Sequence, residues 1–316
     1  MKKIVDHNLP LTKSSIVLFC VIRDEEILLP HFINHYQSIG VTHFVFIDNN
    51  SEDQSVKTIL ENNASTELWK TNQKYSSNSY GVGWVNKLLK SFYKKYWCVV
   101  VDADEFLLLK NENLNSLREI MLETSSNVLE TVLIDLYPKK QNLTQNPYNP
   151  SLYNYCYDIF NEDFLSSDIA LDNSRVVKGG FRRRIFKIGD NAKSSVCLNK
   201  KSFFYNDFYK THELSVGMHW ILPLRFDSWE NYDHKPWYNQ SIRYYKSQAA
   251  IAHLKFTNQD LVSHIKTRIQ RNEDWDNSQE YKEYLSKYTK AFYSDRFSRK
   301  FTSVSNLYKD TLEKLK

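Results

Sequence analysis

The amino-acid sequence predicts an α/β fold, a three-layer α/β/α sandwich with a mostly parallel central sheet. Residues 15–22 and 97–101 are almost continuously apolar, which is typical of strands buried on both faces. A helical pattern separates residues 15–22 from a further strand-like segment, residues 41–47. A right-handed crossover in such a βαβ unit brings the carboxyl ends of both strands to one edge of the sheet. Polar residues follow all three segments, so a ligand site is expected at this edge.

The first unit follows from residue type and spacing. After the strand at residues 15–22, apolar residues recur at helical intervals, namely Ile27, Leu28, Leu29, Phe32, Ile33 and Tyr36. Glu25 and Glu26 are expected in the first turn of this helix, where the helix dipole favours acidic side chains. Gly40 is expected to end the helix before the strand at residues 41–47.

The later elements are predicted in the same way. They are a short strand at residues 67–71, a helix at 82–96, a helix at 114–122, a strand at 131–137 ended by Pro138, a strand at 249–252 and helical structure from residue 260 onward.

Composition excludes several classes of protein. The content of 21 Tyr, 18 Phe and 7 Trp argues against disorder, and 316 residues are enough for a sizeable core. The four cysteines are widely spaced and are expected to be free thiols rather than disulfides or zinc ligands. No apolar run reaches the roughly 20 residues that span a bilayer, and the first residues lack the apolar core of a signal peptide, so we expect a cytoplasmic protein. The net charge of +5 arises from residues 281–316, with nine basic and four acidic residues, which argues against a nucleic-acid-binding body.

Asp102-Ala103-Asp104 directly follows the strand at residues 97–101. Two carboxylates separated by one residue in an extended turn can point to the same side and hold a hard divalent cation, which in turn holds a phosphate. An ordinary acidic loop is the alternative explanation for a single copy of this pattern.

Several segments, taken in order between about residue 15 and residue 290, together resemble a known family. They are residues 23–26, 35–41, 48–53, 102–106, 179–186, 198–203, 217–219 and 252–256. The chain resembles glycosyltransferases with the GT-A (Rossmann-like) fold, in particular bacterial proteins similar to glycosyltransferase family 2. The resemblance implies a catalytic domain over residues 1–260, with a nucleotide-binding half at 15–110 and an acceptor half at 111–260. Residues 261–316 are then a C-terminal helical extension.

The same resemblance implies a metal-dependent, inverting hexosyltransferase. It would move a sugar from a nucleotide-sugar donor, a UDP-sugar, to a glycan or lipid-linked glycan in bacterial capsule or lipopolysaccharide synthesis. Two alternatives stay open, a sugar nucleotidyltransferase and a non-catalytic nucleotide-sugar-binding relative. The first normally needs a Gly-rich loop to hold a triphosphate, and none follows the strand at residues 15–22.

Sugar transfer requires neutralisation of the charge that develops on the leaving diphosphate, and Mn²⁺ or Mg²⁺ does this as a Lewis acid. Asp104 is the expected direct metal ligand, and Asp102 is expected to contact the metal or a ribose. The resemblance adds His253 as a late metal ligand, whereas a core histidine at the end of a strand is the alternative.

Further contacts to the donor are expected from residues at strand ends and in basic segments. The candidates are Arg23, Asp48, Ser51, Asp102, Arg182, Arg184, Lys200 and Lys255. If residues 182–184 form a strand, Arg182 and Arg184 share one face, although an exposed basic edge explains them equally. Asp48, Ser51 and Asp53 also suit an Asx-type turn that caps the next helix. Single lysines such as Lys200 and Lys255 are usually solvated.

The general base that an inverting enzyme needs is not evident from any clean motif. Glu213, Asp135, His219 and Asp163 are the candidates, and each also has a structural explanation.

Two apolar stripes near the C-terminus predict two amphipathic helices. The first stripe comprises Tyr281, Tyr284, Leu285, Tyr288 and Phe292, and the second comprises Phe297, Phe301, Val304, Tyr308, Leu312 and Leu315. Basic polar faces would suit a peripheral anchor at the inner face of the cell membrane. Packing on the catalytic body or in a homodimer is the alternative.

Overall fold

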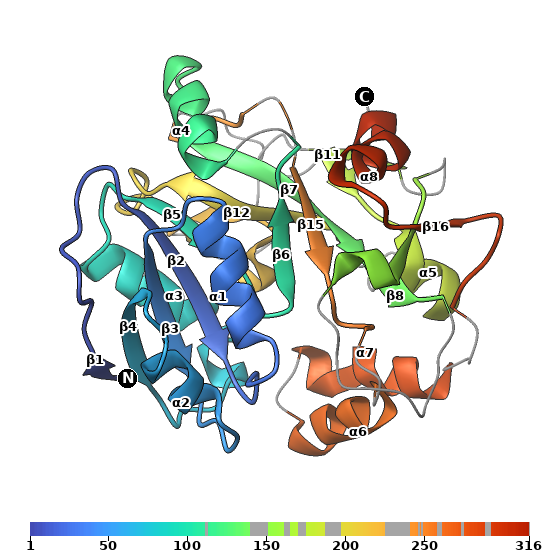
Figure 1. Cartoon of the computed structure of the whole chain (residues 1–316), viewed down its shortest axis with the longest axis horizontal. Coiled ribbons are helices and arrows are strands. Elements are labelled where there is room, and N and C mark those ends of the chain that lie inside the picture. Colours follow the sequence, from blue (N-terminus) through green and yellow to red (C-terminus); the bar gives the residue numbers. More distant parts are fainter. Residues whose placement is uncertain are drawn as a thin grey trace.

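A nine-stranded mixed sheet forms the centre of the computed structural model (Figure 1). The structure describes residues 1–110, 113–139, 151–160, 165–169, 175–186, 197–224, 241–245, 247, 249–257, 261–272, 275–287 and 292–315. Asp163 and Tyr288, named in the sequence analysis, lie outside these ranges.

The strand order is β1-β4-β3-β2-β5-β12-β7-β15-β6. The strands are β1 (Lys2–Val5), β2 (Ile16–Ile22), β3 (His43–Asp48), β4 (Ser65–Lys70), β5 (Trp97–Val100), β6 (Glu105–Leu108), β7 (Val128–Asp135), β12 (Asn199–Tyr205) and β15 (Ala249–His253). The pairing directions make β2, β3, β4, β5, β7 and β15 parallel to one another, with β1, β12 and β6 opposed. The predicted α/β class with a mostly parallel sheet is thus confirmed.

Helices cover both faces of this sheet. Side chains of α1 (Leu29–Ser38), α2 (Ser55–Leu60) and α4 (Leu114–Glu123) pack on one face, where Leu18 of β2 is buried. Residues of α3 (Val82–Ser91) pack on the opposite face against Phe19, because neighbouring residues of a strand point to opposite sides.

The strand order reverses between β2 and β5. From β2 the chain proceeds outward through β3 to β4, and then returns to place β5 on the other side of β2. Ligands in open α/β sheets bind in the crevice beyond the carboxyl ends of the strands at such a switch point. The loops that follow Ile22 and Val100 lie at this switch point.

The remaining elements form smaller sheets and peripheral helices. They are β8 (Tyr137–Pro138), β9 (Tyr155–Asp158), β10 (Leu165–Ile169), β11 (Arg175–Val177), β13 (His212–Leu214), β14 (Ile221–Pro223), β16 (Ser298–Lys300), α5 (Gly180–Phe186), α6 (Leu261–Arg271), α7 (Trp275–Ser286), α8 (Val304–Asp310) and the 3₁₀ turns η1 (Ser76–Asn78), η2 (Leu152–Asn154), η4 (Val216–Met218) and η6 (Leu312–Leu315). All four cysteines are free thiols. Of the helices described, none combines the length and the apolar character needed to cross a bilayer.

Several predicted boundaries are wrong. Helix α1 begins at Leu29 with Pro30 in its first turn, so Glu25 and Glu26 precede the helix instead of occupying its first turn. Asp24 has a φ of 59°, a left-handed conformation that separates β2 from the helix. The helix predicted over residues 82–96 ends at Ser91.

Residues 182–184 lie in helix α5 and not in a strand, so their side chains do not alternate between two faces. Two glycines with positive φ, Gly179 and Gly180, lead into this helix.

The second C-terminal stripe packs on the core of the main sheet, as its packing alternative predicted, but it is not one continuous helix. Strand β16 pairs with β9, and the second helix, α8, begins only at Val304. Phe301, Leu307 and Leu312 are buried in the same core as α1 and α4. The Tyr308 hydroxyl donates to the carbonyl of Leu108 in β6 (2.7 Å) and accepts from the amide of Ala250 in β15 (3.2 Å).

Tyr308→Phe is expected to lower the free energy of unfolding by about 1–2 kcal/mol, because two buried backbone groups lose a hydrogen-bond partner. Chemical denaturation measures this change. Tyr153→Phe, which removes a hydroxyl from an exposed side chain, is the control and should have little effect. Equal stability of the two variants would contradict the assigned role of Tyr308.

Candidate functional site

The acidic motif joins a central strand to an edge strand of the sheet. Residues 101–104 leave β5 and lead directly into β6, which pairs with β15 on the far side of β12 and β7. Side chains from the ends of these intervening strands therefore meet the motif. Lys200 comes from β12, Asp135 from β7 and His253 from β15.

His253 lies between two carboxylates. Its Nε2 is 3.4 Å from Oδ2 of Asp104, and its Nδ1 is 2.6 Å from Oδ1 of Asp135. Burial opposes the charged imidazolium, but the two carboxylates outweigh burial and raise the pKa of His253 to about 9. Burial likewise opposes the charged form of Asp104, yet the positive charges of His253 and two nearby lysines hold its pKa below the ordinary value.

Lys200 binds Asp102 of the motif and also Glu105, the residue that follows the motif. Its buried ammonium group donates to Glu105 and to Oδ2 of Asp102, the latter at 3.2 Å. The side chain of Asp102 remains 48% exposed, whereas that of Glu105 is buried. Burial raises the pKa of Glu105, and both carboxylates raise the pKa of Lys200 against its burial. Lys200 is thus a buried ion-pair partner rather than a solvated lysine.

Asp104, Glu105 and His253 form a group that could hold a metal ion. Among the residues that the structure describes, one ligand atom from each of these three lies within 4.8 Å of the others. Nδ1 of His253 is hydrogen-bonded to Asp135, so Nε2 is directed at Asp104. Many metal-binding histidines are oriented in this way by a carboxylate on their other ring nitrogen. The donor set therefore fits a divalent cation. Glu105, which sequence reasoning missed, directly follows the predicted motif, and this adjacency was the available signal.

An ion-pair network extends from this group to the C-terminal region. Nε of Arg182 donates to Oδ2 of Asp135 at 2.8 Å, and Nη1 of Arg182 lies 3.5 Å from Oε1 of Glu280 in α7. Lys255 lies 3.6 Å from the same Glu280 oxygen, with its ammonium 4.5 Å from the centre of the Tyr281 ring. We call Lys255, Glu280, Arg182, Asp135, His253 and Asp104 the ion-pair network. Opposite charges alternate along it.

The predicted residues after β3 take part in local hydrogen bonds. Oδ1 of Asp48 accepts from the amide of Ser51 (2.9 Å), and Oδ1 of Asp53 accepts from the amide of Ser55 at the start of α2 (2.9 Å). These are the contacts of the Asx-turn alternative. In addition, the amide of Asp24 donates to Oγ of Ser51 (3.1 Å).

The loops after β2 and β3 are tied together reciprocally. The amide of Glu52 donates to Oδ1 of Asp24 (2.8 Å), and the amide of Gln54 donates to Oε2 of Glu26 (2.7 Å). In the other direction, the amide of Glu26 donates to Oδ2 of Asp53 (3.0 Å). This arrangement fixes the polar rim of the crevice next to Arg23.

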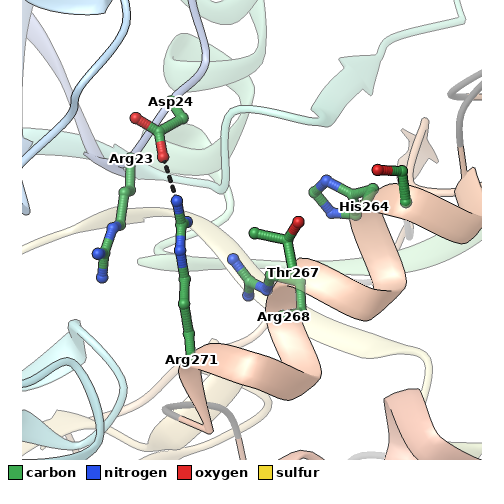
Figure 2. A pocket seen from close by; sticks show the side chains of 7 residues that line it. Arg23, Asp24, His264, Thr267, Arg268 and Arg271 are labelled. Atoms are coloured by element: carbon green, nitrogen blue, oxygen red, sulfur yellow. Dashed lines mark hydrogen bonds and ion pairs between the residues drawn. The ribbon is translucent and has the colours of Figure 1, made fainter.

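Arg23 lines a pocket of about 250 Å³ between this rim and helix α6 (Figure 2). Figure 2 shows Arg23 and Asp24 on one side and His264, Thr267, Arg268 and Arg271 along the helix on the other. Nη2 of Arg271 donates to Oδ2 of Asp24 at 2.6 Å, which links the C-terminal region to the loop after β2.

The candidates for a general base are dispersed. Glu213 pairs with Lys90 (2.9 Å) near the end of α3, toward the amino edge of the parallel strands and away from the acidic motif. Asp135 lies beside His253, and the charges of Arg182 and His253 lower its pKa to about 2 despite burial. Burial lowers the pKa of His219 to about 4, and its Nδ1 lies 2.7 Å from the carbonyl of Asn199. Glu213 thus lies away from the motif, and the pKa values of Asp135 and His219 are both below neutrality.

Arg184 is bound within the protein and does not share a face with Arg182 as a strand would require. Its Nε donates to Oδ2 of Asp158 (2.7 Å), and Nη2 donates to the carbonyl of Phe292 (2.8 Å). The prediction that it contacts a phosphate remains open.

Comparison with known proteins gives no family. No family model matches the chain, and no curated protein matches it. Among solved structures, residues 1–349 of TarS from S. aureus match with 13% identity and a TM-score of 0.37, covering 86% of this chain and 72% of that chain. HddC from Yersinia pseudotuberculosis matches with 11% identity and a TM-score of 0.38, covering 80% and 99%. The CTP:phosphocholine cytidylyltransferase LicC from Streptococcus pneumoniae matches with 12% identity and a TM-score of 0.28, covering 61% and 71%. At these values the likenesses do not bear on the function of the chain.

Glu280→Gln is expected to destabilise the protein in a pH-dependent way. Although burial opposes it, the charges of Lys255 and Arg182 lower the pKa of Glu280 from 4.5 to about 2. A lowered folded-state pKa gives stability that is fully present above about pH 4.5 and is lost as the pH falls toward 2. The wild type should exceed the variant by roughly 1–3 kcal/mol at pH 7 and by progressively less below pH 4.5 in denaturant titrations.

The matched control is Glu283→Gln on the same helix, whose carboxylate lies 3.4 Å from Lys287. It should change stability little at any pH. A difference between wild type and Glu280→Gln that stays constant from pH 7 to pH 3 would show that the network does not depend on the charge of Glu280.

Proposed function

We propose that the protein is a metal-dependent glycosyltransferase that uses a nucleotide-sugar donor. The observation that carries this proposal is the arrangement of Asp104, His253 and Asp135 at the carboxyl edge of the sheet, next to the switch point. A carboxylate and an imidazole oriented by a second carboxylate suit a divalent cation, Mn²⁺ or Mg²⁺. The position suits a nucleotide.

The residues of the chain divide the work of the reaction. Asp104, Glu105 and His253 would hold the ion. As a Lewis acid, the ion would neutralise the negative charge that develops on the leaving diphosphate. Asp135 fixes the orientation of the His253 ring and is itself fixed by Arg182. Lys200 places positive charge beside Asp102, at the most exposed carboxylate of the motif.

The finer assignments belong to the same proposal. The donor is a UDP-sugar, the acceptor is a glycan or lipid-linked glycan of a bacterial surface polysaccharide, and transfer inverts the anomeric configuration. Arg23, at the end of β2 and in the lining of the pocket, is proposed to contact the nucleotide. A sugar nucleotidyltransferase is less well supported, because the loop after β2 presents acidic side chains to α2 instead of a glycine-rich cradle.

Asp104→Ala is expected to abolish metal-dependent transfer, at least 100-fold in kcat, with a small change in stability. The Asp104 side chain is 28% exposed and lies in the loop between β5 and β6, so its removal takes little from the core. Transfer or donor hydrolysis with added Mn²⁺ measures the effect, and excess chelator on the wild-type protein should reproduce it.

Asp207→Ala is the control, since this carboxylate pairs with Arg243 (3.2 Å) beyond the end of β12, at the opposite edge of the sheet. Its activity should match the wild type. Full activity of the wild-type protein in chelator would overturn the metal assignment, and loss of activity in both variants would point to misfolding.

Asp135→Asn should weaken metal binding about 10- to 100-fold, because His253 loses the anionic partner that orients its ring. Calorimetric titration with Mn²⁺ measures the affinity. Asp158→Asn removes another buried carboxylate bound to an arginine, Arg184, but not to a histidine, and should leave Mn²⁺ affinity unchanged. Equal weakening in both variants would mean that loss of a buried charge, not the orientation of His253, explains the effect.

A further inference from the structure

The pocket in Figure 2 has a lining suited to anions. Arg23, Arg268 and Arg271 contribute three guanidinium groups, against one carboxylate from Asp24. The remaining lining residues are Ser263, His264 and Thr267, which add hydroxyl and imidazole groups able to donate hydrogen bonds. A guanidinium group matches phosphate oxygens with two parallel hydrogen bonds.

Helix α6 presents these groups on one face. His264, Arg268 and Arg271 are spaced four and three residues apart, which places them on adjacent turns of the same side. The adjacent side carries Leu261 and Ile265, which are buried in the aromatic core formed with α5 and α7. The apolar side therefore anchors the helix, and the cationic side is held toward the loop after β2.

The pocket lies at the same edge of the sheet as the acidic motif. Arg23 and Asp24 of the pocket follow β2, and the acidic motif follows β5. These two strands are parallel neighbours, so the loops that follow them lie at one edge of the sheet.

We propose that this pocket binds the diphosphate group of the nucleotide-sugar donor, with Arg268 and Arg271 of α6 as phosphate-binding residues. The identity of the donor rests on the proposed function, whereas the anion site does not. The volume of about 250 Å³ is below the roughly 300–1,000 Å³ of pockets that enclose a whole organic ligand, and it suits a phosphate-sized group. Helix α6 is then part of the donor site and does not belong to a separate C-terminal extension.

Calorimetric titrations of the full-length protein test the proposal with three probes, inorganic diphosphate, UDP and uridine, in excess chelator. Arg268→Gln and Arg271→Gln should each weaken binding of inorganic diphosphate and of UDP by about 10- to 100-fold and leave uridine binding unchanged. Lys266→Gln removes one positive charge from an exposed position of the same helix, outside the pocket lining, and should change these affinities less than about threefold.

Thermal unfolding of each variant checks its fold. If Arg268→Gln unfolds, Arg268→Lys replaces it, because lysine keeps the positive charge but lacks the planar guanidinium group. A diphosphate affinity of Arg268→Lys that lies between those of the wild type and Arg271→Gln supports the proposal. Unchanged diphosphate affinity in the arginine variants overturns the assignment of this pocket as a phosphate-binding site. Weakened diphosphate binding with unchanged UDP binding overturns its assignment to the donor and indicates a phosphate from another source, such as a lipid-linked acceptor.

Failure of the proposed function has a different signature. A wild-type protein that turns over no nucleotide-sugar with any divalent metal, yet binds diphosphate through Arg268 and Arg271, retains the anion pocket and loses the glycosyltransferase assignment.

Discussion

The contact of Asp135 with Arg182 and His253 organises this part of the protein. A buried carboxylate without partners is costly, whereas one that is bonded to two cations is tolerated and fixes their positions. Through these two bonds β7 holds the end of β15 and helix α5 in one arrangement. The imidazole then faces Asp104, and the guanidinium faces Glu280 of α7. The geometry of the proposed metal site and the placement of the C-terminal helices therefore depend on one side chain.

Sequence reasoning located the strands and the acidic motif because both have local signals. Residues 97–101 are continuously apolar, and Asp102 and Asp104 follow them directly. By contrast, three consecutive arginines carry no periodicity that separates helix from strand, and the two glycines with positive φ at the start of α5 act only locally. The start of α1 was misplaced because acidic residues near a helix also serve as loop acceptors, which is what Glu26 does for Gln54.

Partners from distant segments had no local signal. Glu280 lies on a helix with mostly polar neighbours, and nothing near it in the sequence indicates that it meets Arg182 and Lys255. The arginines of α6 resemble the solvated face of any amphipathic helix until Arg271 is found against Asp24. The second C-terminal stripe agrees with the packing alternative, since Leu307 and Leu312 join the core. Its backbone is interrupted because residues 298–300 complete a small sheet with β9.

Strand β12 has a consequence for the order in which the chain is made. It lies between β5 and β7 in the middle of the sheet, yet its residues follow β5 by about a hundred positions. At synthesis rates of about 5–20 residues per second, roughly 5–20 seconds pass between the synthesis of β5 and that of β12. During that interval the nascent protein carries an unpaired apolar strand edge, Trp97–Val100, which is a template for association with other chains. Only when β12 emerges does it pair with β5 and close the sheet.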